Sequence, residues 1–298
     1  MTNPSPTLYV VATPIGQLAD ITLRALEVLK SVNWIAAEDT RHSLPLLRHY
    51  GINARLLAVH EHNEAGAAEG IVAKLAQGES VALITDAGTP AISDPGCRVV
   101  AKVRSAGFVV VPVPGASAVV TALSAAGLPE GRFFFAGFLP PKSAARRQIL
   151  ENFAKLPANL VFYEAPHRVL ESVADMLLVF GPARRLVIAK ELTKLFETFH
   201  VTALGDAADW FAADANRLRG EFVLIVEAAP EETDVALEAD KALRILKRLL
   251  AEGLPVKQCA AIAADLAGAN KKALYQAALT LRQSATGHKV GDELDESE

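Results

Sequence analysis

Residues 81–92 read VALITDAGTPAI, a short apolar run followed directly by a turn of small and polar residues. The run at 81–85 has the length and the β-branched content of a buried strand. Gly88 and Pro90 in the following turn end that strand. Because ligands bind at the carboxyl ends of strands in open α/β sheets, residues 86–92 predict one wall of a binding cleft.

Four more apolar runs in the same part of the chain predict buried strands, at residues 8–12, 34–37, 56–59 and 109–113. Helical patterns lie between the strands, near residues 23–30, 43–50, 64–77 and 96–106. Strands joined by helical crossovers predict a parallel sheet. Two further loops of small residues follow strands, TPIG at 13–16 and PGASA at 114–118. Three such loops at successive strand ends favour a ligand cleft.

A second set of strands is predicted at residues 133–138, 160–163, 186–189, 198–202 and 222–226. The interval between 189 and 198 is too short for a helical crossover, so we expect a hairpin there and a mixed sheet. The predicted fold class is α/β, with an N-terminal α/β domain at 1–114 and a second at 115–229. The uncharged segment 105–129 is long enough to span a bilayer, but its prolines favour a strand, a turn and a helix.

The formal net charge of −4 is unevenly distributed along the 298 residues. Residues 241–290 hold nine Lys/Arg against two Asp/Glu, whereas residues 291–298 hold five acidic residues and no basic one. We expect an acidic linker at 230–240, a basic helical module at 241–284 and a disordered acidic tail at 285–298. Helical patterns at 242–252, 256–267 and 271–281 form that module, and the last two resemble a helix-turn-helix in size. Charge alone favours nucleic-acid binding and a solvated face equally.

Several classes of protein are excluded by missing motifs. No two glycines are separated by a single residue, which excludes the dinucleotide-binding G-x-G-x-x-G, and no phosphate-binding G-x-x-x-x-G-K occurs. The two cysteines, Cys97 and Cys259, exclude a disulfide framework and favour a reducing, cytoplasmic location. His60 and His62 share one side of a strand end, but no cysteine or second histidine cluster is near them. We therefore expect no metal site.

Ionisable side chains collect after the second and third predicted strands. Glu38, Asp39 and Arg41 follow the strand at 34–37, and His60 and His62 follow the strand at 56–59. Helix capping explains Asn63 and is an alternative role for Asp39. Capping does not explain why so many ionisable groups lie at one edge, where like charges perturb each other's pKa values, a mark of functional sites. In the second half, Glu164 and Glu191 also follow apolar strands.

Taken together, these segments resemble the tetrapyrrole methylase superfamily over about residues 8–281. The resemblance is carried by ATPIG at 12–16, AAEDTR at 36–41, DAGTP at 86–90, ELTK at 191–194 and GEFVLIV at 220–226. Members that act on tetrapyrroles usually have Gly-Asp-Pro where this chain has Gly88-Thr89-Pro90, and their first loop is richer in glycine. Both departures agree with the branch of the superfamily that acts on ribosomal RNA.

The resemblance implies two α/β domains with S-adenosylmethionine (S-adenosyl-L-methionine) in the cleft between them, and a homodimer. It implies methyl transfer to the ribose 2′-hydroxyl of a cytidine in the decoding centre of 16S rRNA, in the small ribosomal subunit. The cofactor-binding positions that it implies are Pro14, Asp86, Ala87, Gly88, Thr89, Ile92, Ser117, Ala118, Glu164 and Leu192.

A ribose hydroxyl is a poor nucleophile until its proton is removed, so a base is expected near it. The catalytic candidates are Glu38, Asp39, Arg41, His60, His62 and Glu191. The RNA-binding candidates are Arg41, Lys194, Lys257, Lys271, Lys272 and Tyr275, with Lys190 as a further phosphate ligand. Two alternatives stay open: a methyltransferase acting on a tetrapyrrole of the corrin pathway, and a non-catalytic rRNA-binding assembly factor.

Overall fold

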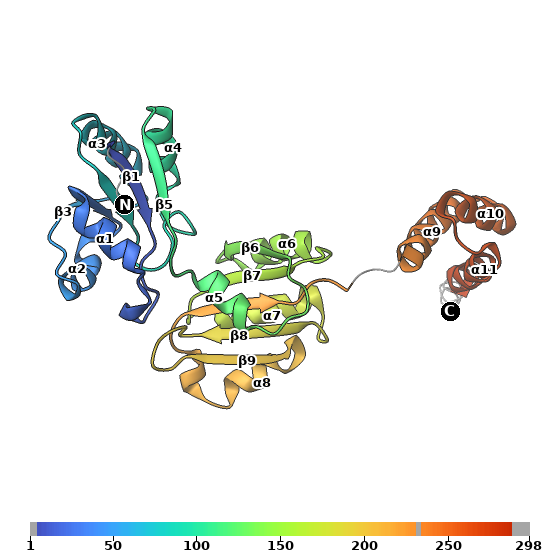
Figure 1. Ribbon diagram of the computed structural model, residues 1–298. Helices are drawn as coiled ribbons and strands as arrows, with labels where there is room; N and C mark the ends of the chain where they lie inside the picture. The colour runs from blue at the N-terminus through green and yellow to red at the C-terminus, as the bar shows by residue number, and fades with distance from the viewer. Residues whose placement is uncertain (1–4, 231–233, 288–298) are drawn as a thin grey trace, which may run out of the picture. The chain divides into compact units, whose positions relative to one another are not determined.

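The computed structural model describes residues 5–230 and 234–287, with side chains for 5–230 and 241–282. The chain divides into two compact units, residues 1–229 and 230–298. The described part of the first unit contains two five-stranded sheets, and that of the second contains helices α9, α10 and α11 (Figure 1).

The first sheet is parallel throughout, with the strand order β3-β2-β4-β1-β5. Its strands are β1 (Thr7–Val11), β2 (Trp34–Ala37), β3 (Arg55–Ala58), β4 (Val81–Ile84) and β5 (Val109–Val113). They lie within one residue of the predicted bounds, so the prediction of a parallel N-terminal sheet is confirmed. The apolar run at 81–85 becomes β4, buried at every position because it lies between β2 and β1.

Helices cover both faces of this sheet. The four helices are α1 (Leu23–Ser31), α2 (Thr40–His49), α3 (Glu64–Ala76) and α4 (Cys97–Ser105). Leu29 and Leu47 from α1 and α2 pack with Ile35 on one face, whereas Ile71 and Val99 from α3 and α4 pack on the other. The chain leaves β1 toward β2 and leaves β4 toward β5, in opposite directions. The topological switch point, where α/β sheets bind ligands, therefore lies between β1 and β4.

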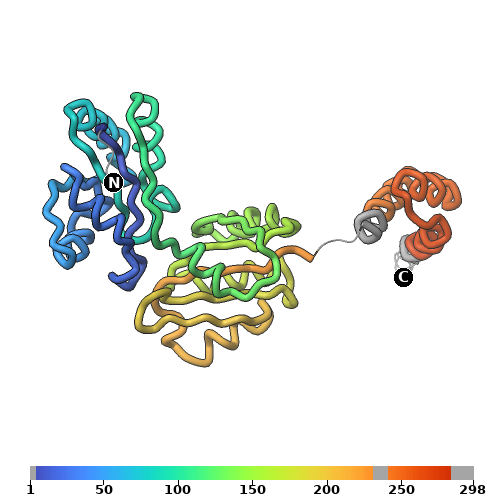
Figure 2. The backbone as a smooth tube through the Cα atoms, in the orientation of Figure 1, coloured from blue at the N-terminus to red at the C-terminus, as the bar shows by residue number. Residues whose placement is uncertain are grey.

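The second sheet has the order β6-β7-β10-β8-β9, and the chain reaches it once, after β5 (Figure 2). Its strands are β6 (Phe133–Phe138), β7 (Asn159–Glu164), β8 (Arg185–Lys190), β9 (Thr198–Ala203) and β10 (Phe222–Val226). Only β6 and β7 pair in parallel, while β10 pairs antiparallel with both of its neighbours. β8 and β9 form an antiparallel hairpin. The predictions of a mixed sheet and of this hairpin are confirmed.

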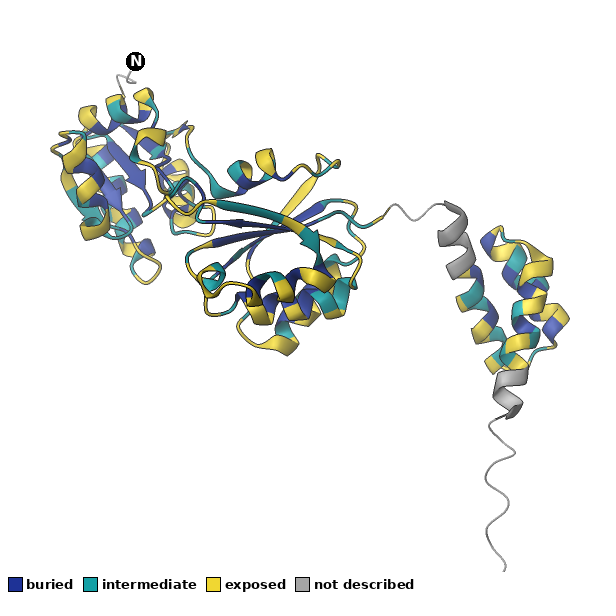
Figure 3. Ribbon diagram, turned by 90° about the horizontal axis from the view of Figure 1, so that it is seen from below, coloured by how far each residue is buried: buried dark blue, intermediate teal, exposed yellow. Residues whose placement is uncertain are grey.

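One face of the second sheet packs against α6 (Ser143–Phe153), α7 (Val169–Phe180) and α8 (Ala207–Ala212) around Phe162 and Phe211. The opposite face packs against α5 (Ala118–Ala125) around Val161 and Val223. Ile15, from the loop after β1, packs in this second cluster beside Leu192. The inner strands of both sheets are buried, whereas the edge strands β3, β5, β6 and β9 and the outer faces of the helices are largely intermediate or exposed (Figure 3).

The uncharged segment 105–129 forms β5, a turn and α5, as predicted. Within the described residues, no helix combines the length and apolarity needed to cross a membrane. Short 3-10 helices lie at Leu18–Asp20, Leu204–Asp206 and Ala215–Leu218.

The second unit consists of α9 (Asp234–Ala251), α10 (Val256–Ala267) and α11 (Lys271–Gly287), packed around Leu246, Cys259 and Leu274. Gly268 ends α10 in the left-handed conformation, with φ at 67°. The three predicted helices are present, but α9 begins at Asp234, so the linker prediction for 230–240 is wrong from 234 onward. Alanine, leucine and glutamate in that stretch favour helix despite its acidity. Residues 231–233 lie outside the described residues.

The predicted disordered tail at 285–298 is also wrong at its start, because α11 continues to Gly287. Once a helix has formed, each added residue gains a hydrogen bond at little cost, so α11 extends past the last apolar position of its pattern. The rest of the predicted tail, residues 288–298, lies outside the described residues.

A buried ion pair joins α6 to α7 and gives a test of the packing. Arg146 is 1% exposed, and its Nε donates to Asp175 Oδ2 at 2.7 Å. Replacing Arg146 by alanine removes the buried partner of Asp175 and leaves that buried carboxylate with the longer contact to Arg147, so R146A should lower the free energy of unfolding by about 3 kcal/mol. Arg147 also contacts Asp175 but is 46% exposed, so R147A should cost less than about 1 kcal/mol. Urea denaturation measures both, and equal losses would contradict this account.

Candidate active site

The three loops predicted to border a cleft are joined by hydrogen bonds. Thr13 N donates to Gly88 O at 2.9 Å, and Gly88 N donates to Thr13 O at 3.0 Å. Gly88 has φ at +81°, a conformation that favours glycine. Thr89 Oγ1 donates to Ala116 O at 3.0 Å, which ties the loop after β4 to the loop after β5. These bonds hold the loops after β1, β4 and β5 at the switch point of the first sheet.

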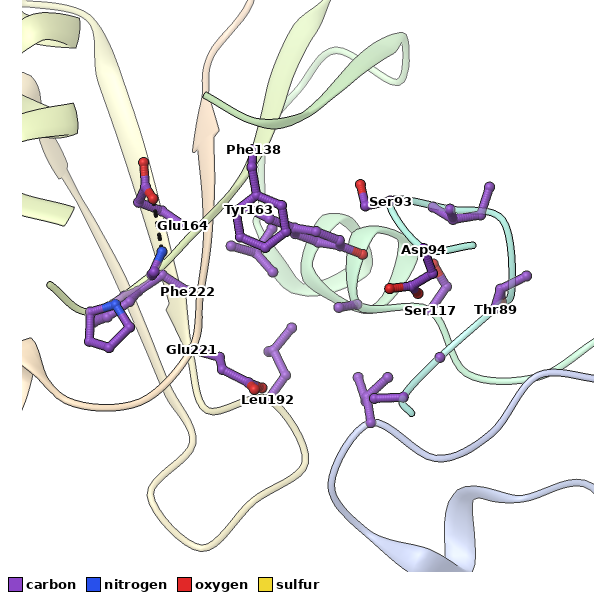
Figure 4. Close-up of a pocket in the computed structure, with 18 residues that line it drawn as sticks. Thr89, Ser93, Asp94, Ser117, Phe138, Tyr163, Glu164, Leu192, Glu221 and Phe222 are labelled. Atoms are coloured by element: carbon purple, nitrogen blue, oxygen red, sulfur yellow. Dashed lines mark hydrogen bonds between the residues drawn. The ribbon is translucent and has the colours of Figure 1, made fainter. Parts of the chain in front are cut away.

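A cavity of about 420 Å³ opens between these loops and the second sheet (Figure 4). Apolar side chains form much of its wall: Ile15, Ile92, Phe138, Leu192 and Val223. Polar groups also line it: Thr89, Ser93, Asp94, Ser117 and Tyr163. Asp94, from the first sheet's side, and Tyr163, from β7, point toward one another across it (Figure 4). A cavity of this size, with apolar walls and a few polar groups, is typical of a binding site for a small molecule.

The cofactor positions implied by the resemblance fall into two groups. The cavity is lined by Ala87, Gly88, Thr89, Ile92, Ser117, Ala118, Glu164 and Leu192. Pro14 and Asp86 instead line a second hollow of about 470 Å³, which we call the Arg41 hollow because Arg41 lines it too. The two spaces share Ile15, Ala87 and Glu221 in their walls, so they adjoin.

The carboxylate of Glu164 is occupied by the protein. It accepts hydrogen bonds from Ala165 N at 2.9 Å and Ser172 Oγ at 2.5 Å. Arg168 Nε lies 3.4 Å from the same carboxylate, and the Glu164 side chain is not exposed. The Glu164 carboxylate therefore connects the end of β7 to the start of α7. Glu164 also forms part of the cavity wall.

A second cluster of interactions, which we call the 191–221 clamp, is formed by Glu191, Lys194, Gly220 and Glu221. Glu191 Oε1 accepts from Glu221 N and from Lys194 Nζ, each at 3.0 Å. Lys194 Nζ also lies 2.8 Å from Glu221 Oε2. A side chain at Gly220, where φ is +86°, would collide with Glu191. The clamp thus holds the loop after β8 against the start of β10.

The clamp also reaches the first sheet. Gln17 N donates to Thr193 Oγ1 at 3.1 Å, and a Cβ on Gly16 would lie 2.6 Å from Lys194 Cγ. Glu191 and Thr193 have φ at 53° and 62°, a left-handed conformation that is strained for residues other than glycine. Such strain persists only where the surroundings hold it, which marks this loop as a positioned part of the site.

Ion pairing in the clamp alters the chemistry of both predicted site residues. Burial raises the pKa of Glu191, but hydrogen bonds from Glu221 N and Lys194 outweigh it, so the pKa is lowered. Burial lowers the pKa of Lys194, but its bonds to Glu221 and Glu191 outweigh that effect, and the pKa is raised. Glu191 is consequently a weak base, and the charge of Lys194 is already neutralised by two carboxylates.

Asp39 is the N-cap of α2, as the capping alternative predicted, and its side chain accepts from Arg41 N at 2.8 Å. The Arg41 side chain also pairs with it, Nη2 to Oδ2 at 3.0 Å. Hydrogen bonding from the Arg41 side chain lowers the pKa of Asp39 to about 2, which makes it a poor base. The Arg41 side chain is 88% exposed at the mouth of its hollow, where it is available to a phosphate.

His60 and His62 line neither the cavity nor the Arg41 hollow. Both are exposed after β3, the outermost strand, whereas the cavity lies at β1 and β4. Asn63 occupies the predicted N-cap position of α3, but its side chain makes no capping hydrogen bond. Its Oδ1 accepts from His60 N at 2.9 Å and its Nδ2 donates to Ala58 O at 3.1 Å. The Asn63 amide therefore stabilises the turn that follows β3.

Two ionisable groups of the cavity, Asp94 and Tyr163, were missed by the sequence reasoning. Burial and, after it, the negative charge of Glu38 raise the pKa of Asp94 to about 6. Burial raises the pKa of Tyr163 to about 12, so its hydroxyl stays protonated. Both lie directly beside segments that the sequence did single out: Asp94 follows the DAGTP turn, and Tyr163 precedes Glu164.

With this geometry in place, comparison with known families identifies the chain. Residues 7–208 match the family "Tetrapyrrole (Corrin/Porphyrin) Methylases", and residues 235–282 match the "RsmI C-terminal HTH domain". The chain belongs to the tetrapyrrole methylase family.

Two relatives named ribosomal RNA small subunit methyltransferase I resemble it over nearly their whole length. The protein of Escherichia coli O157:H7 is 54% identical over 278 residues, covering 93% of this chain and 96% of the relative. The protein of Pseudomonas aeruginosa is 54% identical over 276 residues, covering 92% and 96%. In fold, the chain resembles the solved uroporphyrin-III C-methyl transferase from Thermus thermophilus complexed with S-adenyl homocysteine. That alignment has a TM-score of 0.52 and 19% identity, over 74% of this chain and 97% of that one.

The clamp makes a prediction about stability and pH. In E191Q the carboxamide still accepts a hydrogen bond but no longer carries a charge, so unfolding should cost about 1–2 kcal/mol less at neutral pH. The pKa of Glu191 is lower in the folded chain than its ordinary value of 4.5. The stability that the Glu191 charge contributes is therefore fully present above pH 4.5, and it is lost as the pH falls through the lowered pKa. Denaturant unfolding from pH 7 to pH 3 measures it, with E61Q, an exposed carboxylate, as control. A constant difference at all pH values would contradict the assignment.

Proposed function

We propose that this chain transfers a methyl group from S-adenosylmethionine to the ribose 2′-hydroxyl of a cytidine in the decoding centre of 16S rRNA. The observation that carries the proposal is the extent of the similarity. Relatives named for methylation of small-subunit ribosomal RNA match both units of the chain at 54% identity. The cytoplasmic location and the homodimer that the resemblance implies belong to the same proposal.

The cavity suits this cofactor in chemistry as well as in size. Apolar side chains such as Ile92 and Leu192 can pack against a flat aromatic base, and Thr89, Ser93 and Ser117 offer hydroxyls to polar groups. Gly88 brings the backbone close to the cavity without a side chain in the way. We assign the cofactor to this cavity and the nucleotide to the adjoining Arg41 hollow.

S-adenosylmethionine supplies an electrophilic methyl group on a positively charged sulfur. The protein's part is to hold the attacking oxygen in line, which accounts for much of the acceleration in such displacements. The loops after β1 and β4 lie between the cavity and the Arg41 hollow and contribute Ile15 and Ala87 to both walls. Arg41 at the mouth of the hollow would hold a phosphate beside the target ribose.

The second unit is proposed to bind the RNA. Lys257 lies in the first turn of α10, and Lys271 and Lys272 begin α11, all three on the exposed surface. Asn270 caps α11, because its Oδ1 accepts a hydrogen bond from Lys272 N at 2.9 Å. This bond uses the backbone of Lys272 and leaves its side chain exposed. Tyr275, one turn further on, is 38% exposed and can stack on an unpaired base. A helix N-terminus with two lysines is an electropositive surface for phosphates.

A tetrapyrrole substrate is the second reading that the fold permits. Two solved enzymes, a cobalt precorrin-4 methyltransferase and a uroporphyrin-III-C-methyltransferase, are 17% and 22% identical to this chain, and each alignment covers 74% of it. That likeness establishes the fold alone. The match of residues 235–282 to a helix-turn-helix domain favours the nucleic-acid substrate, because a small tetrapyrrole does not require a basic helical surface.

Transfer of tritiated methyl groups tests the reaction directly. With S-adenosylmethionine labelled in the methyl group, the chain should label small ribosomal subunits that lack the mark, and nuclease mapping should place the label on one cytidine ribose. Subunits that already carry the mark serve as control. Label on a tetrapyrrole, or cofactor and subunit binding without transfer, would support one of the two alternatives instead.

Truncation separates the two proposed binding functions. The first unit has its own cores, so a chain ending at Ala229 should fold and bind S-adenosylmethionine with unchanged affinity. It should bind the subunit more weakly, and its affinity should depend less steeply on salt, because fewer phosphates are neutralised. Calorimetry with the cofactor and filter binding at several salt concentrations measure both. Unchanged subunit binding would refute an RNA-binding role for the second unit.

A further inference from the structure

Four ionisable side chains line the cavity: Asp94, Tyr163, Glu164 and Glu221. Glu164 is enclosed by Ser172 and Arg168, and Glu221 is paired with Lys194. Tyr163 is protonated at neutral pH and serves as a donor, not as a base. Asp94 is half-buried and is the remaining member of this set with a carboxylate that no basic side chain pairs.

The surroundings of Asp94 form a short chain of hydrogen-bonding groups. Thr85, at the end of β4, is buried, and its Oγ1 donates to Glu38 Oε2 at 2.7 Å. A hydrogen bond from the same hydroxyl stabilises the ionised carboxylate of Asp94 and so lowers the Asp94 pKa. One hydroxyl hydrogen serves one acceptor at a time. Glu38 and Asp94 therefore compete for the Thr85 hydrogen, and while Thr85 donates to Glu38 the ionised Asp94 carboxylate lacks that stabilisation.

The backbone around Asp94 is held in place. Ala91 and Ser93 have φ at 70° and 64°, and Ser93 Oγ would lie 3.1 Å from a Cβ on Gly137 of β6. Gly96, two residues further on, donates its N–H to Glu64 at 2.8 Å. Left-handed residues that packing holds in place occur where a loop must present one side chain accurately.

We propose that Asp94 is the general base of the methyl transfer, with Thr85 and Glu38 as its positioning residues. This inference rests on the proposed function and requires the target ribose to reach from the Arg41 hollow into the adjoining cavity, which Asp94 lines. The O–H bond of the ribose hydroxyl breaks and its proton passes to an Asp94 carboxylate oxygen. The oxygen's electron pair forms the new O–CH₃ bond, and the pair of the breaking C–S bond stays on sulfur. S-adenosylhomocysteine and the methylated ribose leave, and Asp94 returns its proton to water.

The electrostatics around Asp94 agree with this role. The groups that act on it are Glu38 at the end of β2, Asp86 at the end of β4 and, from the second sheet, Tyr163. Burial and the charges of Glu38 and Asp86 bring the Asp94 pKa to about 6, near the range where a base is both ionised and effective at neutral pH. The fully ionised form exists only above that value, so the rate should fall as the pH drops through it.

The variant D94N is the first test. It should bind S-adenosylmethionine and small subunits as the wild type does, melt at a similar temperature, and lose methyl transfer by about 100-fold or more. E151Q, which removes an exposed carboxylate on α6, is the control and should keep full activity. Full activity in D94N would overturn the proposal. Loss of cofactor binding in D94N would overturn it too, since Asp94 would then be a cofactor ligand.

The variant E38Q tests the positioning with a readout that a structural role would not move. It keeps an acceptor for Thr85 but removes the negative charge, so the Asp94 pKa should fall and the acid limb of the pH–rate profile should shift to lower pH. Difference infrared spectra of the ligand-free protein should show a carboxylic acid that titrates near pH 6, at lower pH in E38Q, and not at all in D94N. An unchanged infrared titration in either variant would refute the assignment. A wild type inactive on ribosomal subunits would refute the proposed function, and the base assignment with it.

Discussion

The pair of hydrogen bonds between Thr13 and Gly88 is the contact on which the site depends. β1 and β4 are neighbours in the sheet, but the chain leaves them in opposite directions, so their following loops would otherwise diverge. The two hydrogen bonds between Thr13 and Gly88 hold these two loops together at the switch point. Ile15 is thereby directed onto the second sheet, and the loop at 86–96 is directed along the edge of the cavity. The same pair of hydrogen bonds places the cavity and the Arg41 hollow side by side.

The charged groups with which the second sheet closes the cavity are already paired within the protein. Glu164 is paired with Arg168, and Glu191 and Glu221 share the single positive charge of Lys194. Charges paired in this way hold loops in position without creating a strong local field. Exposed basic side chains for a polyanion are found instead on the helices of the second unit and at Arg41, which is 88% exposed although it is paired with Asp39. On the proposed function, the residues of the cavity bind the cofactor, whereas Arg41 and the second unit bind the RNA.

Strand positions were predictable because a buried strand needs a continuous apolar run, and the ten runs in this sequence are separated by clear turns. The first three loops were predictable for the same reason, since each follows a strand directly. The order of strands within the sheet was not predictable from such runs. His60 and His62 follow a strand, as Asp86 does, but β3 is at the sheet's edge and β4 is near its middle. Asp94 was missed because seven residues of irregular loop separate it from Asp86.

The sequence by itself determined the α/β class, the two sheets, the helical second unit and the loops that carry the site, because local apolar patterns and turn residues specify these. Only the tertiary structure decided which ionisable groups are free to act. The carboxylates of Glu164, Glu191 and Asp39 already accept hydrogen bonds from other groups of the protein. Asp94, by contrast, faces the cavity, with Glu38 and Asp86 near it. The reactivity of a carboxylate is set by its burial and by the charges within a few ångströms of it. Those neighbours come from separate strands, and only folding brings them together.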